Sequence, residues 1–251
     1  MTTGVGTQSG TFRTSASVSG VRLQPGMQLG DYVVGEASWP LRIADAYRAN
    51  GPLGPATLYV IHARIAANPH VRDHIIAGTR AAAALPEHKH LVRTLAAGLT
   101  GDILWIATED ADGQLVRDML AKKKRAAPAS SSASMSGGPG LGTRAAGNLI
   151  SGVAAALAEV HHGALDAESI SVSRTGRVRV IDLALGQGTL AAMIAGLIPT
   201  QSSIAPELLT GAPPTASADV YSIGALLYET LVGSPLGRGP PRSSGEPTSV
   251  S

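Results

Sequence analysis

Residues 161–186, "HHGALDAESISVSRTGRVRVIDLALG", hold the densest group of side chains in this sequence that could do chemistry. Two histidines begin the stretch. Asp166 follows them in a turn, and Asp182 lies near the end of the second of two strand-like runs, "SISVS" and "VRVIDL". Carboxylates and imidazoles can transfer protons or hold a metal ion. Which of these they do depends on the elements that bring them together.

The histidines nearest to such chemistry form two close pairs, His88 with His90 and His161 with His162. Neither pair has the i, i+4 spacing that puts two metal ligands on one face of a helix. The sequence also has no cysteine, which excludes disulfides, zinc–thiolate sites and thiol nucleophiles. We therefore expect no metal site built on these histidines.

The composition is typical of a globular protein. The 251 residues are 44% hydrophobic, which is enough apolar material for a core. The formal net charge is only +2, so we expect no nucleic-acid partner. The apolar run at 190–199 is too short to cross a bilayer, and residues 1–20 lack the regions of a secretory signal. We expect a cytoplasmic protein without a membrane partner.

The first part of the chain reads as strands with one helix. Residues 1–28 are rich in Gly, Ser and Thr, and we expect a disordered tail there. The pattern predicts five strands, in "DYVVGEA", "RIADAYRA", "ATLYVIHARI", "LVRTLAAG" and "DILWIATED". A helix is predicted from Pro69 to Leu85, with Asn68 as its N-cap and the proline in its first turn.

The second part of the chain reads as mainly helical. It contains a low-complexity insert at 121–147, of which we expect residues 121–142 to be disordered. The run "TRAAGNLISGVAAALAEVHH" predicts one helix. The run "ASADVYSIGALLYETLVG" predicts a second helix that is apolar enough to be buried and that ends at Gly233. We expect residues 235–251 to be a disordered tail.

Four segments resemble bacterial Ser/Thr protein kinases. The resemblance lies in "HKHLVRTLAAG", "ILWIATEDADGQLVRDML", "HGALDAESISVSRTGRVRVIDLALG" and "IAPELLTG" with the helix after it. It covers roughly residues 29–236 and implies an α+β, two-lobed protein kinase-like fold. The N-lobe would be a small antiparallel sheet at 29–111, and the helical C-lobe would occupy 112–234. We expect this C-lobe to be incomplete, because the family's last helices find no counterpart in the sequence.

Under this resemblance, the residues that carry phosphoryl transfer in the family have been replaced. The reaction uses a lysine on the phosphates, a glutamate that holds this lysine, an aspartate that orients the substrate hydroxyl, and an asparagine on a magnesium ion. These positions fall on Tyr59, Gly78, Ala164 and Ser169. The first three supply no charge, and the serine is a poorer metal ligand than asparagine. We therefore expect no catalytic residue at these positions.

The segment that corresponds to the family's phosphate-binding loop has lost most of its glycines. The run "VVGEASWPLRIADAYRA" keeps Gly35 only, and it has Trp39 and Pro40 inside the turn. A backbone cradle for phosphates needs several glycines, and a proline removes a donor. Asp182 corresponds to the family's magnesium-binding aspartate; it could hold magnesium or could cap nearby N–H groups, and we favour the structural role. We expect no cofactor, with ATP and magnesium bound only if activity survives.

Four further residues take their roles from the resemblance. Thr108 and Glu109 correspond to the hinge, which would contact a nucleotide. Glu207 and Asp219 correspond to residues of the structural framework. Asp219 should hydrogen-bond the backbone of the catalytic loop near His162. The usual arginine partner of Glu207 has no counterpart in the sequence.

The resemblance thus predicts a pseudokinase, a catalytically inactive Ser/Thr kinase homologue that acts as a binding or regulatory module in signalling. We expect a protein partner, for example a true kinase. One alternative is an active or weakly active kinase that transfers phosphate from ATP to protein. Asp166 would then be the nearest substitute base, displaced by two residues. A second alternative is a non-functional kinase fragment.

Helix 218–232 is the element on which a partner could bind. In the family this helix is buried, and later helices cover it. Without them, six apolar side chains would lack cover, and a large bare patch usually marks an interaction surface. These side chains are Val220, Ile223, Leu226, Leu227, Tyr228 and Leu231. We expect self-association or partner binding through this helix.

Overall fold

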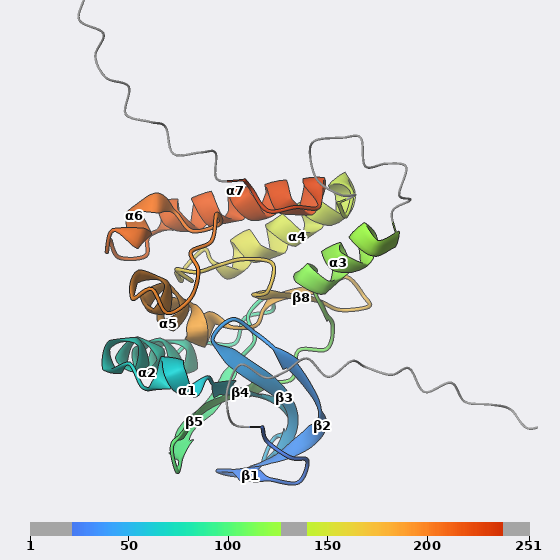
Figure 1. Ribbon diagram of the computed structural model, residues 1–251. Helices are drawn as coiled ribbons and strands as arrows, with labels where there is room; N and C mark the ends of the chain where they lie inside the picture. Colours follow the sequence, from blue (N-terminus) through green and yellow to red (C-terminus); the bar gives the residue numbers. More distant parts are fainter. Residues whose placement is uncertain (1–21, 127–139, 238–251) are drawn as a thin grey trace, which may run out of the picture.

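The computed structural model describes residues 22–126 and 140–237, and these form two lobes (Figure 1). An antiparallel sheet makes up most of the first lobe, and helices make up most of the second. This is the α+β, two-lobed arrangement that the resemblance implied. The expected tails before residue 22 and after residue 237, and insert residues 127–139, lie outside the described residues.

Six strands form the sheet of the first lobe, in the order β1-β2-β3-β4-β6-β5, and every neighbouring pair is antiparallel. The strands are β1 (Gln28–Leu29), β2 (Tyr32–Pro40), β3 (Ala44–Gly51), β4 (Gly54–Ile61), β5 (Thr94–Thr100) and β6 (Ile103–Glu109). The five expected strands are confirmed, and β1 is an additional one. The sheet has a different set of side chains on each of its two faces, because successive residues of a strand point to opposite sides.

Two boundaries of the first lobe were wrong. The expected disordered tail extended to residue 28, but Leu23 is only 4% exposed and packs against the sheet. Its burial holds the segment before β1 in place. The third strand was expected to run on to Ile65, but β4 ends at Ile61 and the short helix α1 (Ala63–Ala66) follows.

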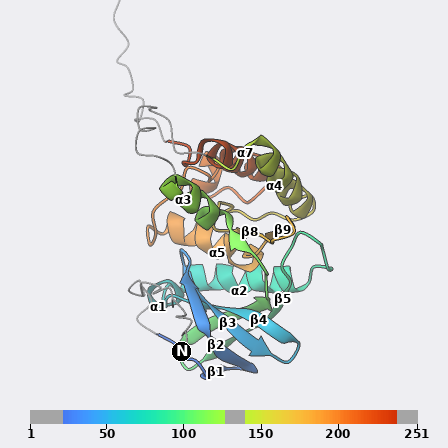
Figure 2. The same cartoon turned by 90° about the vertical axis from the view of Figure 1, so that its right-hand side faces the viewer.

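Helix α2 (Pro69–Ala83) confirms the predicted helix, and it ends two residues before Leu85. The Asn68 side chain accepts a hydrogen bond from the Val71 N–H at 3.1 Å, as an N-cap does. Pro69 occupies the first turn, where it costs no hydrogen bond. The buried face of α2 packs against the sheet on one side and a helix of the second lobe on the other (Figure 2).

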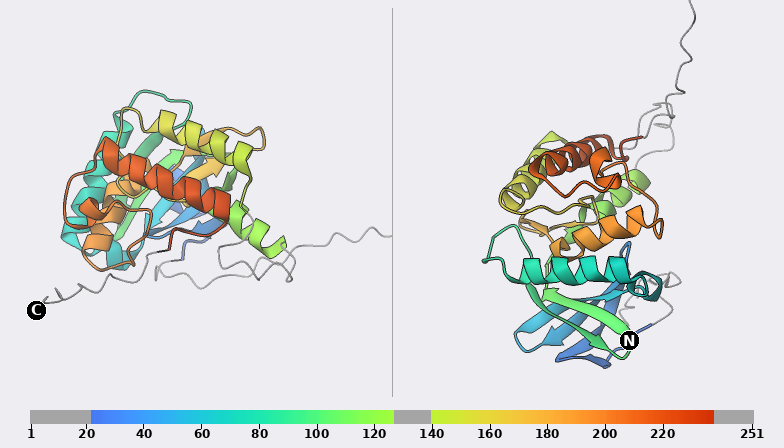
Figure 3. Two further views of the ribbon diagram at one scale, coloured as in Figure 1. Left: turned by 90° about the horizontal axis from the view of Figure 1, so that it is seen from above. Right: turned by 90° about the vertical axis from the view of Figure 1, so that its left-hand side faces the viewer.

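The second lobe contains five helices and a small sheet within the described residues. The helices are α3 (Val116–Ala126), α4 (Thr143–Ala156), α5 (Leu183–Ile194), α6 (Pro206–Leu209) and α7 (Ala216–Val232). The antiparallel sheet contains β7 (Gln114–Leu115), β8 (Ile170–Val172) and β9 (Val178–Val180). Helices α4 and α7 lie side by side around Leu149, Val153 and Leu226 (Figure 3). Gly233 ends α7 with a positive φ of 81°, as predicted.

The predicted boundaries around the insert need correction. Residues 121–126 were expected to be disordered, but α3 runs through them to Ala126. Lys123, Lys124 and Arg125 lie in the last turn of α3, where cations stabilise the negative end of the helix dipole. Helix α4 begins at Thr143, as its own pattern predicted, so the insert does not reach residue 147. It ends at Ala156 rather than continuing to His162.

Helix α5 was not predicted at all. Its apolar residues surround the whole helix, so the sequence shows no amphipathic period, and the helix is buried almost throughout. It stacks directly on α2 (Figures 2 and 3). Among residues 22–126 and 140–237, no helix is both long and apolar enough to span a bilayer.

Helix α7 exposes fewer apolar side chains than expected. Leu226 is fully buried against α4, and Ile223 and Leu227 are half-buried. Val220, Tyr228 and Leu231 are exposed as expected, and Tyr221 joins them. The apolar surface of α7 is therefore a stripe of four side chains rather than the whole helix.

Candidate functional site

The residues that the resemblance assigned to catalysis lie where the two lobes meet. Ala164, Ser169 and Asp182 line one cavity there, which Leu41, Arg42 and Ile43 of the β2–β3 turn close from the other side. The cavity has a volume of about 20 Å³. That is room for about one water molecule. A nucleotide does not fit in this space.

Asp182 is held by two side chains of the 161–186 stretch. Its carboxylate accepts a hydrogen bond from the Ser169 hydroxyl at 3.1 Å and lies 2.8 Å from His162 Nε2. It caps no N–H at the start of α5, so the expected capping role is wrong. Because a serine hydroxyl and a buried imidazole both approach the carboxylate, Asp182 is tied into the core of the second lobe.

His162 is fully buried, and its ring lies among carboxylates. Burial, the largest single effect, would lower the pKa of this imidazole, but the carboxylates of Asp182, Asp166 and Asp219 together outweigh it. The net result is a pKa above the ordinary value for histidine. The ring can therefore donate from Nε2 to Asp182, while its Nδ1 accepts a hydrogen bond from the Ala164 N–H at 3.3 Å.

Asp219 occupies the structural position that the resemblance implied. Its Oδ1 accepts a hydrogen bond from the His162 backbone N–H at 3.3 Å, which is the contact expected. Its Oδ2 lies 2.7 Å from His161 Nδ1, a contact the sequence did not suggest. Glu207 is exposed, and its carboxylate has no partner among the described residues.

Tyr59 and Gly78 are each held close to the backbone of residues 181–184. The Tyr59 hydroxyl is buried and donates a hydrogen bond to the Ile181 carbonyl at 3.0 Å. Burial raises the pKa of this phenol above its usual value, and the Asp182 charge raises it further, so it stays neutral. A Cβ atom on Gly78 would lie 2.8 Å from the Ala184 carbonyl oxygen. The backbone of α5 therefore excludes any side chain at residue 78.

Arg42 closes the cleft by pairing with acidic residues of the other lobe. Its guanidinium is hydrogen-bonded to the Asp166 carboxylate and lies 3.6 Å from Glu168. Arg117 adds a second cross-link, since it lies 3.0 Å from Glu168 and donates to the Pro40 carbonyl at 3.2 Å. No sequence signal could have found these pairs, because Arg42 and Asp166 are 124 residues apart.

Gln201 joins the same cluster from the segment between α5 and α6. With its amide nitrogen directed at Asp166, it donates to that carboxylate at 2.7 Å, and its oxygen accepts from Arg42. The Asp166 carboxylate, which the sequence offered as a substitute base, is therefore paired with an arginine and an amide. We call this group, Arg42, Asp166, Glu168, Arg117 and Gln201, the cleft latch.

The hinge counterparts are occupied as well. The Glu109 carboxylate is paired with Arg179 and accepts from the Arg93 N–H at 3.0 Å. The Thr108 hydroxyl is buried and donates to the Glu109 carbonyl at 3.1 Å. Nearby, Trp39 and Leu41, at the end of β2, pack against an apolar cluster of Val92, Leu115 and Ile181. Among the described residues, no group of three His, Asp or Glu side chains could hold a metal ion.

Comparisons with known proteins identify similar chains. No protein-family model matches the sequence. A serine/threonine-protein kinase PknB from Mycobacterium leprae is 37% identical over 71 residues, which are 27% of this chain and 11% of that protein. The serine/threonine-protein kinase PkaB of Streptomyces coelicolor is 25% identical over 209 residues, 76% of this chain and 46% of that protein. The chain spans less than half the length of either relative.

Solved structures show the same architecture. A Mycobacterium tuberculosis PknI kinase domain has a TM-score of 0.65 to this chain at 22% identity, and the match covers 90% of this chain and 83% of that domain. The apo form of PpkA-294 has a TM-score of 0.62 at 15% identity, with coverage of 85% and 80%. At these identities, the likeness concerns the fold.

Proposed function

We propose that this chain, whose fold is that of a bacterial Ser/Thr protein kinase domain, is a catalytically inactive kinase homologue that acts as a binding or regulatory module in signalling. The observation that carries the proposal is the cavity of about 20 Å³ at Ala164, closed by the cleft latch. Phosphoryl transfer depends on positioned charges around a bound nucleotide. This site lacks the space for a nucleotide, and its charged side chains are paired with one another.

Three of the four replaced residues support the same proposal, because each has a structural use in the inactive arrangement. Tyr59 bonds the backbone at Ile181, where a lysine would need a carboxylate partner. Gly78 admits the α5 backbone, where a glutamate side chain would collide with it. Ser169 holds Asp182. The substitutions are therefore mutually consistent rather than random losses.

An active kinase is the second candidate, and its base would have to be Asp166. That carboxylate is ion-paired with Arg42 and is only 8% exposed. Proton transfer from a substrate hydroxyl to Asp166 would require the latch to open and the base to work from a displaced position. The inactive module is therefore the better-supported function.

The nucleotide test follows directly. In thermal unfolding with ATP and either Mg²⁺ or Mn²⁺, we expect no rise in Tm, because the cavity cannot admit the nucleotide. A ligand at 100 times its Kd would stabilise a folded protein by about 2.7 kcal/mol, which is readily detected. An active Ser/Thr kinase domain run in parallel serves as the positive control. A saturable rise in Tm for this chain would refute the proposal that the cleft binds no nucleotide.

We further propose that the apolar stripe of α7 mediates self-association or partner binding. The stripe consists of Val220, Tyr221, Tyr228 and Leu231, which are 38–69% exposed. Exposed apolar side chains gathered on one helix favour burial against another surface.

Light scattering at micromolar concentration should therefore give a mass above that of one chain. The double variant Val220→Lys, Leu231→Lys should be monomeric, because two charges in the stripe oppose its burial. The matched control Leu53→Lys replaces a leucine that is 74% exposed in the β3–β4 turn, and it should associate as the wild type does. A monomeric wild type would rule out self-association.

A further inference from the structure

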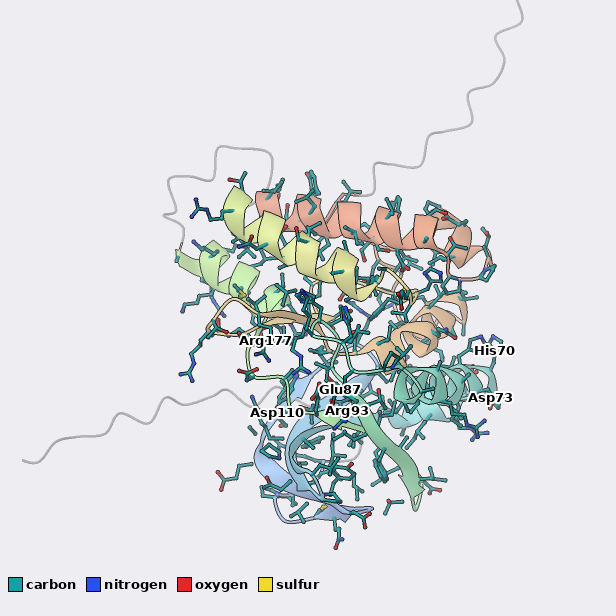
Figure 4. The ribbon with its side chains drawn as sticks, turned by 180° about the vertical axis from the view of Figure 1, so that it is seen from behind. His70, Asp73, Glu87, Arg93, Asp110 and Arg177 are labelled. Atoms are coloured by element: carbon teal, nitrogen blue, oxygen red, sulfur yellow. The ribbon has the colours of Figure 1, made fainter. Side chains whose placement is uncertain are left out.

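Two cavities join along the C-terminal half of α2, and none of their lining residues belongs to the 20 Å³ cavity at Ala164. Their volumes are about 390 Å³ and 260 Å³. Because they share Ala82, Leu85 and Leu183, they form one elongated depression, which we call the back groove. Glu87 and Arg93 line the groove, and Figure 4, which shows the molecule from behind, places them between the sheet and the helices. The volume is in the range of ligand-binding sites.

The floor of the back groove is apolar and continuous. Three residues of α2 and one that follows the helix line the floor. Their spacing of i, i+3, i+4 and i+7 puts them on one face: Gly78, Ala81, Ala82 and Leu85. Opposite them, Leu183 and Val160 pack in a cluster with Leu91 and Val180, so the wall is preformed. The floor is about 10 Å long from the helical rise, and an extended chain advances about 3.3 Å per residue. The floor thus spans roughly three residues of an extended peptide, and the charged residues beyond its two ends would contact the residues that flank them.

The two ends of the back groove carry opposite charge. At one end, Arg93 is paired with Glu87 at 3.1 Å and Arg179 is paired with Glu109, so these four charges balance. Lys89 lines the same end and has no partner among the described residues, which leaves one free cation there.

At the other end of the groove, Glu159 is exposed and likewise has no partner among the residues that the structure describes. An unpaired cation and an unpaired anion thus lie at opposite ends of a groove with an apolar floor, so that a bound peptide would have a preferred orientation.

We propose that the back groove binds a short peptide segment of a partner protein. The segment has an acidic residue near Lys89, apolar residues over Leu85 and Leu183, and a basic residue near Glu159. Charge complementarity at the ends fixes its orientation, and burial of the apolar middle supplies affinity. The inference goes beyond the proposed inactivity, since it holds whether or not the cleft binds nucleotide.

Synthetic hexapeptides provide the test. One library carries Asp or Glu at one end, Leu, Ile or Val in the middle and Lys or Arg at the other end; a matched library has Gln in place of every charge. Binding is followed by NMR on the wild-type chain. We expect members of the charged library to bind with a Kd below about 1 mM, and the Gln library to bind at least about fivefold more weakly. The largest amide shifts should lie at Leu85, Lys89 and Leu183.

Two charge-reversal variants locate the site. Lys89→Glu should weaken the best charged peptide by at least about fivefold, because an attraction becomes a repulsion. Lys122→Glu makes the same change at an exposed lysine of α3, outside the groove, and should leave binding unchanged. The inference is overturned if no charged peptide binds saturably, if the shifts map elsewhere, or if the two variants weaken binding equally. Both positions are exposed, so loss of folding does not confound the comparison.

Discussion

Replacing Gly186 with alanine is expected to lower the free energy of unfolding by about 3 kcal/mol. An ideal Cβ at residue 186 would lie 2.1 Å from the His162 carbonyl oxygen, which is far inside contact distance. The clash is with backbone, and His162 is itself held by Asp182 and Asp219, so its neighbours cannot yield cheaply. Helix α5 must then move away from the 161–186 stretch. Urea unfolding followed by circular dichroism measures the change.

The matched control is Gly224→Ala, which makes the same substitution inside helix α7. A Cβ there would meet nothing within 4 Å, and residue 224 is exposed. Since alanine has the better helix propensity, this variant should gain about 0.5–1 kcal/mol. The two glycine variants should therefore shift stability in opposite directions. If both behave alike, the close packing of α5 on His162 is not what requires Gly186.

Replacing Arg42 with alanine is expected to lower the free energy of unfolding by about 2–3 kcal/mol. Asp166 is nearly buried and would lose its cationic partner, and removing one member of a buried pair leaves an uncompensated charge. The expected loss lies at the low end for such pairs, because Arg42 is 28% exposed and Gln201 still bonds Asp166.

The exposed pair between Arg93 and Glu87 supplies the control for this variant. The Arg93 and Glu87 side chains are 43% and 80% exposed, so Arg93→Ala should cost less than about 1 kcal/mol. Hydrogen exchange adds a local readout, since loss of the latch should raise exchange in the β2–β3 turn more than in α7. Equal losses for Arg42→Ala and Arg93→Ala would mean that the cleft latch does not hold the lobes together.

Local patterns in the sequence determined most of the elements. The asparagine–proline start of α2, the glycine at the end of α7 and the alternation of the five expected strands are all signals between residues close in the chain. Each signal involves residues within one turn or one strand, so helix capping and strand propensity are enough to predict the element. The order of these elements, with its four kinase-like segments, was enough to place Asp219 beside the His162 backbone.

The state of the candidate site was decided only by tertiary structure. Helix α5 carries no amphipathic period because it is buried on every side, and burial on every side is a property of its neighbours. In the sequence, Gly78 stands at the position that the resemblance assigns to a glutamate. In the fold, its missing side chain leaves room for the Ala184 carbonyl.

The contacts that close the cleft join residues far apart in the chain. Tyr59 reaches Ile181 across 122 residues, and Arg42 reaches Asp166 across 124. The sequence alone therefore determined which residue types stand at the positions that the resemblance assigns to catalysis. Only the tertiary structure decided which contacts these residues make. Side chains more than 100 residues apart in the sequence meet only after the two lobes have packed together.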